Sequence, residues 1–531
     1  MTLHGKNILG HRLSAAGSET FRAIDPALSG PIEPPFFVAT AEEVDEAVGL
    51  ADRAFRDGPA PEPAQTASLL ERIADQIEAV GDELIDRCGA ETGLPPGRLK
   101  MERARTAGQL RLFAALVAEG SWVDARIDRA IPDRQPLPKP DLRRMLVPIG
   151  PVLVFPASNF PLAFSVAGGD TASALAAGCP LIVKARPAHP GTSELIGMAV
   201  QKAMVAAGMP DGWFSMLHGP GRSTGVRLVE HPAVKAVGFT GSLSGGRKLM
   251  DVAAARPEPI PVYAEMGSIN PVFLLPGALA ERAEAIAAGL CQSMNLGVGQ
   301  FCTQPGLVIA LEDANLARLI DALAKLVEET APGTMLLKPI LDGYCEGTER
   351  LSRTPGVTPA ARSRQSPDPG KTQAAAAVFV TDAETFLASD DLCAEVFGPA
   401  TLLVRCRSPE QLLAIAEELE GQLTATIHAT EADLKTHGRL VATVRRKAGR
   451  LVFGGFPTGV EVCPSMHHGG PYPASSDAHF TSVGTAAVYR FARPVCYQGF
   501  PQHCLPPELQ DKNVRNVWRL VDGVLTKDDV P

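Results

Sequence analysis

Three residue types that together can perform acyl transfer stand in three separate segments of the chain. Cys302 lies in NLGVGQFCTQPG, between a glycine-rich approach and a Pro-Gly exit, which favours a nucleophile held on a tight loop. Asn159, in FPASNFPLAF, carries an amide that can donate to a developing oxyanion. Glu265, in VYAEMGSINPVFLLP, carries a carboxylate that can deprotonate water. Thiol, amide and carboxylate together indicate a covalent thioester and its hydrolysis.

Taken singly, each of these residues has a structural alternative. Cysteine is among the most buried residue types, so one cysteine of ten is more often part of a core than a nucleophile. An asparagine placed like Asn159, shortly before a proline, is more often a turn residue. A lone glutamate such as Glu265, at an α/β junction, is usually solvated. The functional interpretation therefore requires that the fold bring the three side chains together.

A possible nucleotide site lies in GFTGSLSGGRKL, residues 238–249. The segment follows a predicted strand and opens a predicted helix, so its backbone N–H groups and the helix dipole can face a pyrophosphate. The spacing of Gly241 and Gly246 is wider than in G-x-G-x-x-G, and glycine-rich turns of this kind are commonly structural. Lys184, at the end of another predicted strand, is placed to reach a ribose hydroxyl; the alternative is an ordinary surface lysine.

Composition narrows the class of protein. The 531 residues are 45% hydrophobic and 21% charged, with 50 basic and 59 acidic residues and a net charge of -9. Without a basic run the chain offers no footprint for nucleic acid or an anionic membrane surface. No apolar run approaches the roughly 18 residues that span a bilayer, and the N-terminus lacks a signal-peptide apolar core. A soluble, cytoplasmic protein is expected.

The ten cysteines form no C-x-x-C pair and show no zinc-ligand spacing, which indicates reduced thiols. The adjacent His467 and His468 suggest metal binding, but no matching third ligand is visible. No metal site is predicted.

The first part of the chain is expected to be mainly helical. Residues 1–39 are expected to be irregular and then extended. Thr40 and Glu43 match a capping box at a helix start, and apolar spacing predicts further helices over 68–88 and about 96–119.

Four prolines in residues 130–142 then indicate a linker or an extended arm. Beyond it, short apolar runs alternate with alanine-rich helical stretches, as in βαβ units of a mostly parallel sheet. The predicted strands are 151–155, 181–183, 234–239, 272–275, 307–310, 377–380 and 401–404, with helices over 168–177 and 192–207. Two such units in tandem imply a cleft, with ligands at the carboxyl ends of the strands.

The ordered motifs SNFPLAF, GFTGS, AEMGSINP, GQFCT and EVFGP resemble the aldehyde dehydrogenase superfamily. The resemblance implies a bilobal α/β fold with a Rossmann-like cofactor domain, an α/β catalytic domain and a small β oligomerisation element. It implies a cofactor domain over 1–129 and 146–265 and a catalytic domain over 266–475. Residues 130–145 and 476–531 would form the arm and C-terminal segment, including a strand at Thr485–Phe491.

The same resemblance implies the site residues. Cys302 would be the nucleophile, Glu265 the general base, and Asn159 with the Cys302 backbone N–H the oxyanion hole. The implied cofactor residues are Lys184 at the adenosine ribose, Gly241, Ser242 and Gly246 along the pyrophosphate, and Glu395 and Phe397 at the nicotinamide end.

The segment LIVKARPAHPGTSE bears on the choice between NAD and NADP. Members that prefer NAD often have a glutamate three positions after the lysine, where this chain has Pro187 beside Arg186. A missing carboxylate and a nearby cation favour NADP, or dual use of NAD and NADP. The implied partners are a small-molecule aldehyde and further copies of the chain in a homodimer or homotetramer.

Further segments, including INPVFLLPGAL, FPTGVEV and RPVCYQ, resemble the branch that contains α-ketoglutaric semialdehyde (2,5-dioxovalerate) dehydrogenases. The alternative is a fatty or other aliphatic aldehyde substrate. A CoA-acylating relative need not retain Glu265, and a catalytically silent one would be expected to lose Cys302. A semialdehyde carboxylate needs an anchor, for which Arg143, Arg144 and the loop 456–462 are candidates.

Overall fold

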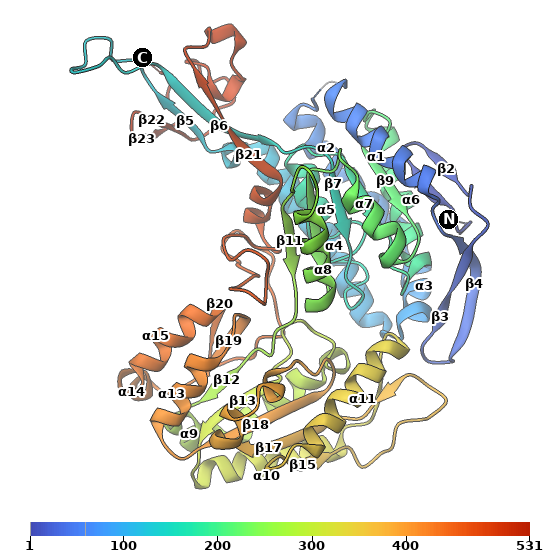
Figure 1. Ribbon diagram of the computed structural model, residues 1–531, viewed down its shortest axis with the longest axis vertical. Helices are drawn as coiled ribbons and strands as arrows, with labels where there is room; N and C mark the ends of the chain where they lie inside the picture. The colour runs from blue at the N-terminus through green and yellow to red at the C-terminus, as the bar shows by residue number, and fades with distance from the viewer. Residues whose placement is uncertain (1, 59, 531) are drawn as a thin grey trace.

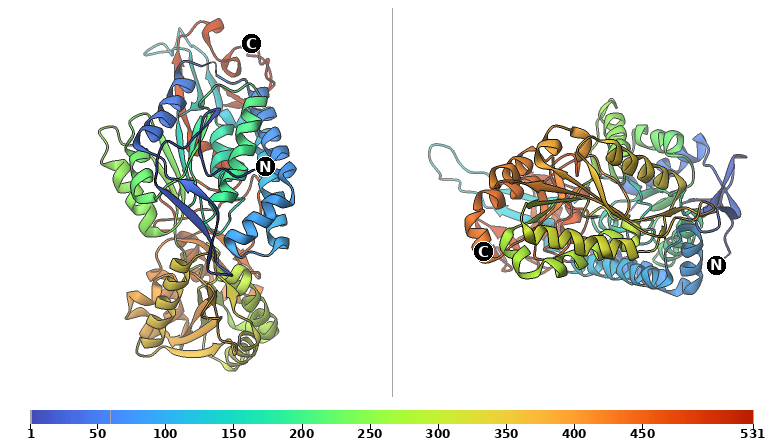
Figure 2. Two further views of the ribbon diagram at one scale, coloured as in Figure 1. Left: turned by 90° about the vertical axis from the view of Figure 1, so that its right-hand side faces the viewer. Right: turned by 90° about the horizontal axis from the view of Figure 1, so that it is seen from below.

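The computed structural model describes residues 2–58 and 60–530, which form two lobes and a projecting sheet (Figure 1). Each lobe is built around its own seven-stranded sheet, and a five-stranded sheet extends from the upper lobe. Figure 2 shows the same stacking of the lobes from a second side. Within these residues, no helix is long and apolar enough to cross a membrane. The cytoplasmic location stays a prediction. All ten cysteines are free thiols.

The N-terminal residues are more ordered than expected. Strands β1 (Asn7–Leu9) and β2 (Arg12–Ser14) extend the edge of the first sheet. Strands β3 (Thr20–Asp25) and β4 (Gly30–Phe37) pair with each other as a separate hairpin.

The expected helices follow, with one correction. Helix α1 (Ala41–Arg56) begins with the predicted capping box of Thr40 and Glu43, and the last helix, α4, spans Pro96–Glu119. The single helix predicted over 68–88 is wrong. It is two helices, α2 (Pro63–Val80) and α3 (Asp82–Thr92), separated by Gly81 at φ +71°. A positive φ ends a helix and favours glycine, so this residue breaks an otherwise continuous apolar stripe.

The first sheet has the strand order β11-β10-β7-β8-β9-β1-β2, and its five strands from β7 to β11 are parallel. These strands are β7 (Val152–Phe155), β8 (Leu181–Lys184), β9 (Phe214–Leu217), β10 (Ala236–Thr240) and β11 (Val262–Glu265). The helices between them are α5 (Gly169–Ala176), α6 (Pro190–Ala206), α7 (Val226–Glu230) and α8 (Leu243–Ala254). Strands β7, β8 and β9 are buried throughout, as expected when helices cover both faces of a parallel sheet.

The second sheet has the order β15-β17-β18-β13-β12-β19-β20 and is parallel except at β15. Its strands are β12 (Val272–Leu274), β13 (Leu307–Leu311), β15 (Thr358–Arg362), β17 (Ala377–Asp382), β18 (Ala400–Cys406), β19 (Gln422–His428) and β20 (Ala448–Phe453). A short separate pair is formed by β14 (Gly333–Thr334) and β16 (Gln373–Ala374). The helices of this second lobe are α9 (Pro276–Asn295), α10 (Ala314–Glu329), α11 (Lys338–Arg353), α12 (Ala383–Leu387), α13 (Pro409–Glu418), α14 (Glu431–Thr436) and α15 (Gly438–Lys447).

The projecting sheet has the order β21-β6-β5-β22-β23. Its strands are β5 (Ala125–Asp128), β6 (Leu142–Pro148), β21 (Ala492–Gln498), β22 (Arg519–Val521) and β23 (Val524–Thr526). The proline-rich segment connects β5 to β6, which pair antiparallel, so it is part of an extended arm.

The strand predicted at Thr485–Phe491 is wrong, because this segment is a 3₁₀ helix and β21 begins one residue later. Its buried residues Ala487, Val488 and Phe491 do not alternate, as they would on one face of a strand. Arg490 is buried as well and forms an ion pair with Asp170 at 2.8 Å.

Candidate functional site

The three predicted catalytic residues converge between the two lobes. Glu265 is the last residue of β11, and Asn159 lies in the loop after β7. Cys302 lies between α9 and β13, after a turn in which Gly297, Val298 and Gly299 all have positive φ. Any side chain at Gly299 would collide with the backbone of Gly398. The glycine-rich approach is therefore required by close backbone contact, as the tight-loop interpretation expects.

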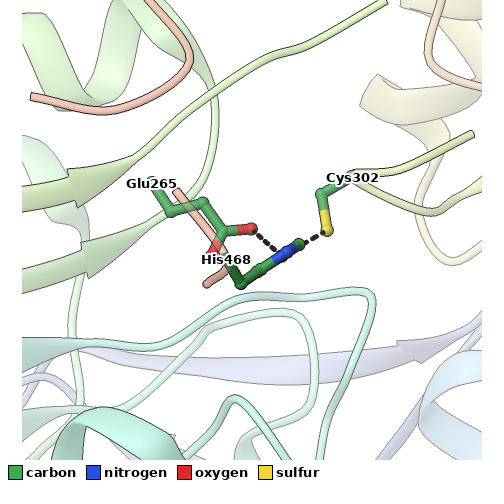
Figure 3. Close-up of side chains that lie close together, drawn as sticks. All are labelled: Glu265, Cys302 and His468. Carbon is green, nitrogen blue, oxygen red and sulfur yellow. Dashed lines mark hydrogen bonds and ion pairs between the residues drawn. The ribbon is translucent and has the colours of Figure 1, made fainter. Parts of the chain in front are cut away.

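A histidine that sequence reasoning did not place here completes the group (Figure 3). Nε2 of His468 lies 3.4 Å from Sγ of Cys302 and 3.0 Å from Oε1 of Glu265. One imidazole nitrogen thus faces both the thiol and the carboxylate. The arrangement can pass a proton between the nucleophile and a buried base.

The histidine and the glutamate are held firmly in place. The backbone N–H of His468 donates to Oγ1 of Thr481 at 2.8 Å, and its carbonyl accepts from Oγ of Ser482 at 3.1 Å. The same Ser482 hydroxyl donates to Oε2 of Glu265. Both side chains are buried, and Nδ1 of His468 has no hydrogen-bond partner within residues 2–58 and 60–530. Proton exchange at His468 is therefore directed to Nε2.

The surroundings shift the pKa values of Glu265 and Cys302 in opposite directions. Burial raises the pKa of Glu265, but the interactions of its carboxylate with His468 and with the Ser482 hydroxyl outweigh this effect, so the pKa lies below its ordinary value. Burial, and next the Glu265 carboxylate, raise the pKa of the Cys302 thiol well above its usual range. At neutral pH the carboxylate is ionised, and the thiol needs a proton acceptor to become a nucleophile.

The structure places two further potential ligand residues beside His468, which the sequence did not indicate, and the absence of a metal site stays a prediction. Ligand atoms of His468, Glu265 and Cys302 lie within 4.8 Å of one another. Their mutual hydrogen bonds account for this proximity.

The amide of Asn159 lies next to the thiol loop. Its Nδ2 donates to the carbonyl of Gln300 at 3.0 Å, two residues before Cys302. A second amide, that of Asn270, fixes the loop from the other side by donating to the carbonyls of Cys302 and Gln304, each at 2.9 Å. Sequence reasoning missed Asn270, and the motif SINP that contains it is the only local signal.

A cavity of about 390 Å³ joins the catalytic and the predicted cofactor residues. Eight of the ten predicted site residues line it, namely Asn159, Arg186, Gly241, Ser242, Glu265, Cys302, Glu395 and Phe397. The two others lie outside its lining. Lys184 is buried at the end of β8, and a side chain at Gly246 would collide with Met266.

The cofactor side of the cavity has the groups that a nicotinamide dinucleotide needs. Ser242 caps α8 and accepts from the backbone N–H of Gly245, so the positive end of that helix opens on the cavity. The carboxylate of Glu395 lies so close to Gly267 that a side chain at position 267 would clash with it. Burial raises the pKa of Glu395 to about 7. The positive end of α8 suits the phosphates of such a cofactor, and the carboxyl group of Glu395 can bind a ribose hydroxyl.

Two cations lie near the adenosine end proposed from the sequence. Burial, and next the charge of Arg186, lower the pKa of Lys184 to about 7. Nε of Arg186 donates to Oγ of Ser158 at 2.7 Å, and Pro187 is exposed beside it. The described residues thus place no carboxylate at the position that would repel a 2′-phosphate.

Two candidate substrate anchors lie elsewhere. Arg143 and Arg144 belong to β6 of the projecting sheet, where Arg143 pairs with Asp141 and Asp511. Arg144 pairs with Asp124, the residue directly before β5. Their charges are already matched by these carboxylates, so they are not the anchor.

Comparison with known proteins agrees with this geometry. Residues 13–470 match the model of the aldehyde dehydrogenase family. "Alpha-ketoglutaric semialdehyde dehydrogenase 2" of Azospirillum brasilense is 52% identical over 526 residues, covering 98% of this chain and 99% of the relative. "Alpha-ketoglutaric semialdehyde dehydrogenase" of Acinetobacter baylyi is 45% identical and covers 99% of each chain.

Solved structures confirm the predicted fold class. An aldehyde dehydrogenase mutant from Bacillus cereus superimposes with a TM-score of 0.79 at 23% identity, covering 93% of this chain and 96% of that one. Betaine aldehyde dehydrogenase from Staphylococcus aureus, solved with NAD+, also gives 0.79, at 20% identity and 94% and 96% coverage.

Proposed function

Because the chain belongs to the aldehyde dehydrogenase family, and so oxidises aldehydes to acids with NAD(P), we propose that its substrate is 2,5-dioxovalerate and its product 2-oxoglutarate. The observation that carries this proposal is the identity of 52% and 45%, over nearly the whole chain, to two α-ketoglutaric semialdehyde dehydrogenases. The convergence of thiol, histidine and carboxylate supports the chemistry.

In the proposed first half-reaction, Nε2 of a neutral His468 that carries its ring proton on Nδ1 accepts the proton of the Cys302 thiol, and Sγ forms a bond with the aldehyde carbon. The new N–H at Nε2 then donates to Oε1 of Glu265. The carbonyl oxygen becomes an oxyanion that accepts hydrogen bonds from Nδ2 of Asn159 and the Cys302 backbone N–H. The bound nicotinamide cofactor supplies the hydride acceptor for the carbon of this thiohemiacetal. A thioester to Cys302 remains.

In the second half-reaction, Glu265 takes a proton from water, directly or through His468. The resulting hydroxide adds to the thioester carbon, the carbon–sulfur bond breaks, and the carboxylic acid leaves. Sγ recovers its proton from the histidine. The low pKa of Glu265 keeps the base ionised at neutral pH, and burial strengthens its interactions with the reacting groups.

The substrate is tested with purified enzyme and both cofactors. The expected result is a higher kcat/KM with 2,5-dioxovalerate than with succinic semialdehyde or a long-chain aldehyde, with acid formed in the absence of CoA. A clear preference for the long-chain aldehyde would overturn the proposal.

For the cofactor, we propose a preference for NADP over NAD, or equal use of both. The support is the exposed Pro187 in place of a carboxylate, with Lys184 and Arg186 as nearby cations. Comparing kcat/KM for the two cofactors tests this, and a large preference for NAD would contradict it.

For assembly, we propose a homodimer or homotetramer that uses the projecting sheet. The outer strand β23 leaves Val524 65% and Leu525 64% exposed, which is unfavourable for apolar side chains in a monomer. We also propose the domain limits stated above, with the cofactor domain ending at Glu265. Light scattering of the purified protein tests the assembly, and a monomer at micromolar concentration would contradict it.

A further inference from the structure

Two arginines donate hydrogen bonds to the loop 456–462, which was a candidate substrate anchor. Arg105, on α4, donates to the carbonyl of Val460. Arg450, on β20, donates to the carbonyls of Gly459, at 2.6 Å, and Pro457. Residues from two distant parts of the chain therefore direct their guanidinium groups to the same short stretch, 457–460.

Neither guanidinium has a carboxylate within ion-pair distance in the part of the chain that the structure describes. Nε of Arg105 and Nε of Arg450 are both buried and have no hydrogen-bond partner there. The neighbouring Arg98 is different, because it forms an ion pair with Glu102 at 3.1 Å. An unbonded buried Nε also occurs in Arg144, Arg350, Arg405 and Arg519, so it does not mark a ligand site by itself. In Arg105 and Arg450 it coincides with a position within electrostatic reach of Cys302, which points to an anionic ligand that supplies the missing acceptors.

Packing contacts connect both arginines to the segment that carries His468. The guanidinium carbon of Arg105 is 5.9 Å from the ring centre of Phe164, and that ring is 6.4 Å from the ring of His468. The residue before Arg450, Gly449, packs so tightly against residues 467–469 that a side chain there would clash with the carbonyl of Gly469.

Electrostatics agree with this placement. Burial lowers the pKa of each arginine, and the charge of the Cys302 thiolate acts on both in the opposite direction. The exposed Glu461 and the buried Glu102 also act on Arg105, but Glu102 is already paired with Arg98. The two guanidinium groups are thus within electrostatic reach of the thiol and retain unused donors.

We propose that Arg105 and Arg450 bind the carboxylate of the substrate while its aldehyde end meets Cys302. This inference rests on the proposed function and names the residues that select the substrate. A guanidinium presents donors in a planar fork that matches a carboxylate, and a second guanidinium can donate to the adjacent keto oxygen. An aliphatic tail in the same place leaves both charges without an acceptor, so the site discriminates against fatty aldehydes.

The test compares 2,5-dioxovalerate with pentanal, a neutral aldehyde of the same chain length, in Arg105→Met and Arg450→Met. Each variant is expected to lower kcat/KM for 2,5-dioxovalerate about 10²-fold, mainly through a higher KM, because a buried charge partner is lost. The loss with pentanal is expected to be far smaller. Arg353→Met, which removes an exposed arginine that forms an ion pair with Glu349, serves as the control and should leave kcat/KM for both aldehydes unchanged.

Equal losses with both aldehydes would show a structural role, and no loss with 2,5-dioxovalerate would show that the carboxylate binds elsewhere; either result overturns the inference. If a methionine variant fails to fold, Arg105→Lys and Arg450→Lys replace it, because lysine keeps the positive charge. The ratio of kcat/KM for 2,5-dioxovalerate to kcat/KM for pentanal is expected to fall in these lysine variants, but less than in a methionine variant that folds. In the lysine variants, weaker inhibition of pentanal oxidation by 2-oxoglutarate gives a second reading of the same site, and unchanged inhibition contradicts it.

The wild-type enzyme separates this inference from the proposed function. If it prefers succinic semialdehyde to butanal but does not favour 2,5-dioxovalerate, the proposed substrate is wrong, and the arginine site stands if its variants lose that preference. If it prefers no carboxylate-bearing aldehyde over its neutral counterpart, both fail.

Discussion

The two sides of Cys302 differ in how completely their polar groups are satisfied. On one side, His468, Glu265 and Ser482 form a closed, buried hydrogen-bonded chain. On the other side, Arg105 and Arg450 hold the loop 457–460 within electrostatic reach of the thiol, and Nε of each is buried without an acceptor among the described residues. The groups of the first side that face the thiol are hydrogen-bonded to one another without a substrate, whereas Nε of each arginine on the second side has no acceptor in the described part of the chain.

This difference separates chemistry from recognition. A preorganised proton path must be in place before the aldehyde arrives, because any rearrangement would add to the barrier. A recognition site gains selectivity by leaving donors that only the correct ligand satisfies. Substitutions on the two sides should therefore have different signatures.

The largest effect is expected where the two sides meet. Cys302→Ala removes the atom that forms the covalent bond, and turnover should fall to background with every aldehyde and either cofactor. The loss should exceed roughly 10⁴-fold, as for other nucleophile deletions. Steady-state formation of reduced cofactor measures it. Near wild-type rates would remove the basis of the comparison.

Asn159→Ala removes an oxyanion donor and should lower kcat roughly 10²- to 10³-fold. Because the oxyanion forms with any aldehyde, the loss should be similar for 2,5-dioxovalerate and pentanal, unlike that of the arginine variants. A loss confined to the carboxylate-bearing substrate would instead place Asn159 on the recognition side.

His468→Gln sharpens the chemical side and should lower kcat about 10²-fold. Burial and the Glu265 carboxylate raise the pKa of the thiol, so without the imidazole the thiolate forms only at higher pH. The pH profile of Cys302 alkylation by iodoacetamide should move to higher pH. An unmoved profile would mean that His468 does not accept the thiol proton.

The smallest effect is expected for a change that touches neither side. Pro187→Glu introduces a carboxylate near Lys184 and Arg186, and should shift the ratio of kcat/KM for NADP and NAD toward NAD by about tenfold, through repulsion of the 2′-phosphate. Discrimination between 2,5-dioxovalerate and pentanal should stay the same. A ratio that does not move would place the 2′-phosphate away from this loop.

The features that could be predicted from the sequence are those that depend on residues close together in the chain. The helix at Pro96–Glu119 and the capping box of Thr40 depend on neighbouring residues, and so does the turn that places Ser242 at the start of α8. The order of the catalytic motifs added Asn159, Glu265 and Cys302, which the fold brings to one cavity.

The features that were missed depend on contacts between distant residues. His468 is 166 positions from Cys302 and 203 from Glu265, and its only local signal, a second adjacent histidine, suggested a metal instead. Arg105 and Arg450 approach one loop from two lobes, while Arg143 and Arg144 looked equally suitable in sequence but are neutralised in the projecting sheet. Charge in a sequence does not show which cation lacks a partner.

The most direct test of the account is to trap the thioester. In Glu265→Gln the first half-reaction should proceed while hydrolysis is slowed, so mixing with 2,5-dioxovalerate and cofactor should give a burst of reduced cofactor close to one per active site. Peptide mass spectrometry should then find the acyl group on Cys302. A burst absent in the variant despite cofactor binding, or an acyl group on another residue, would contradict the assignment of Cys302 as nucleophile and Glu265 as the hydrolytic base.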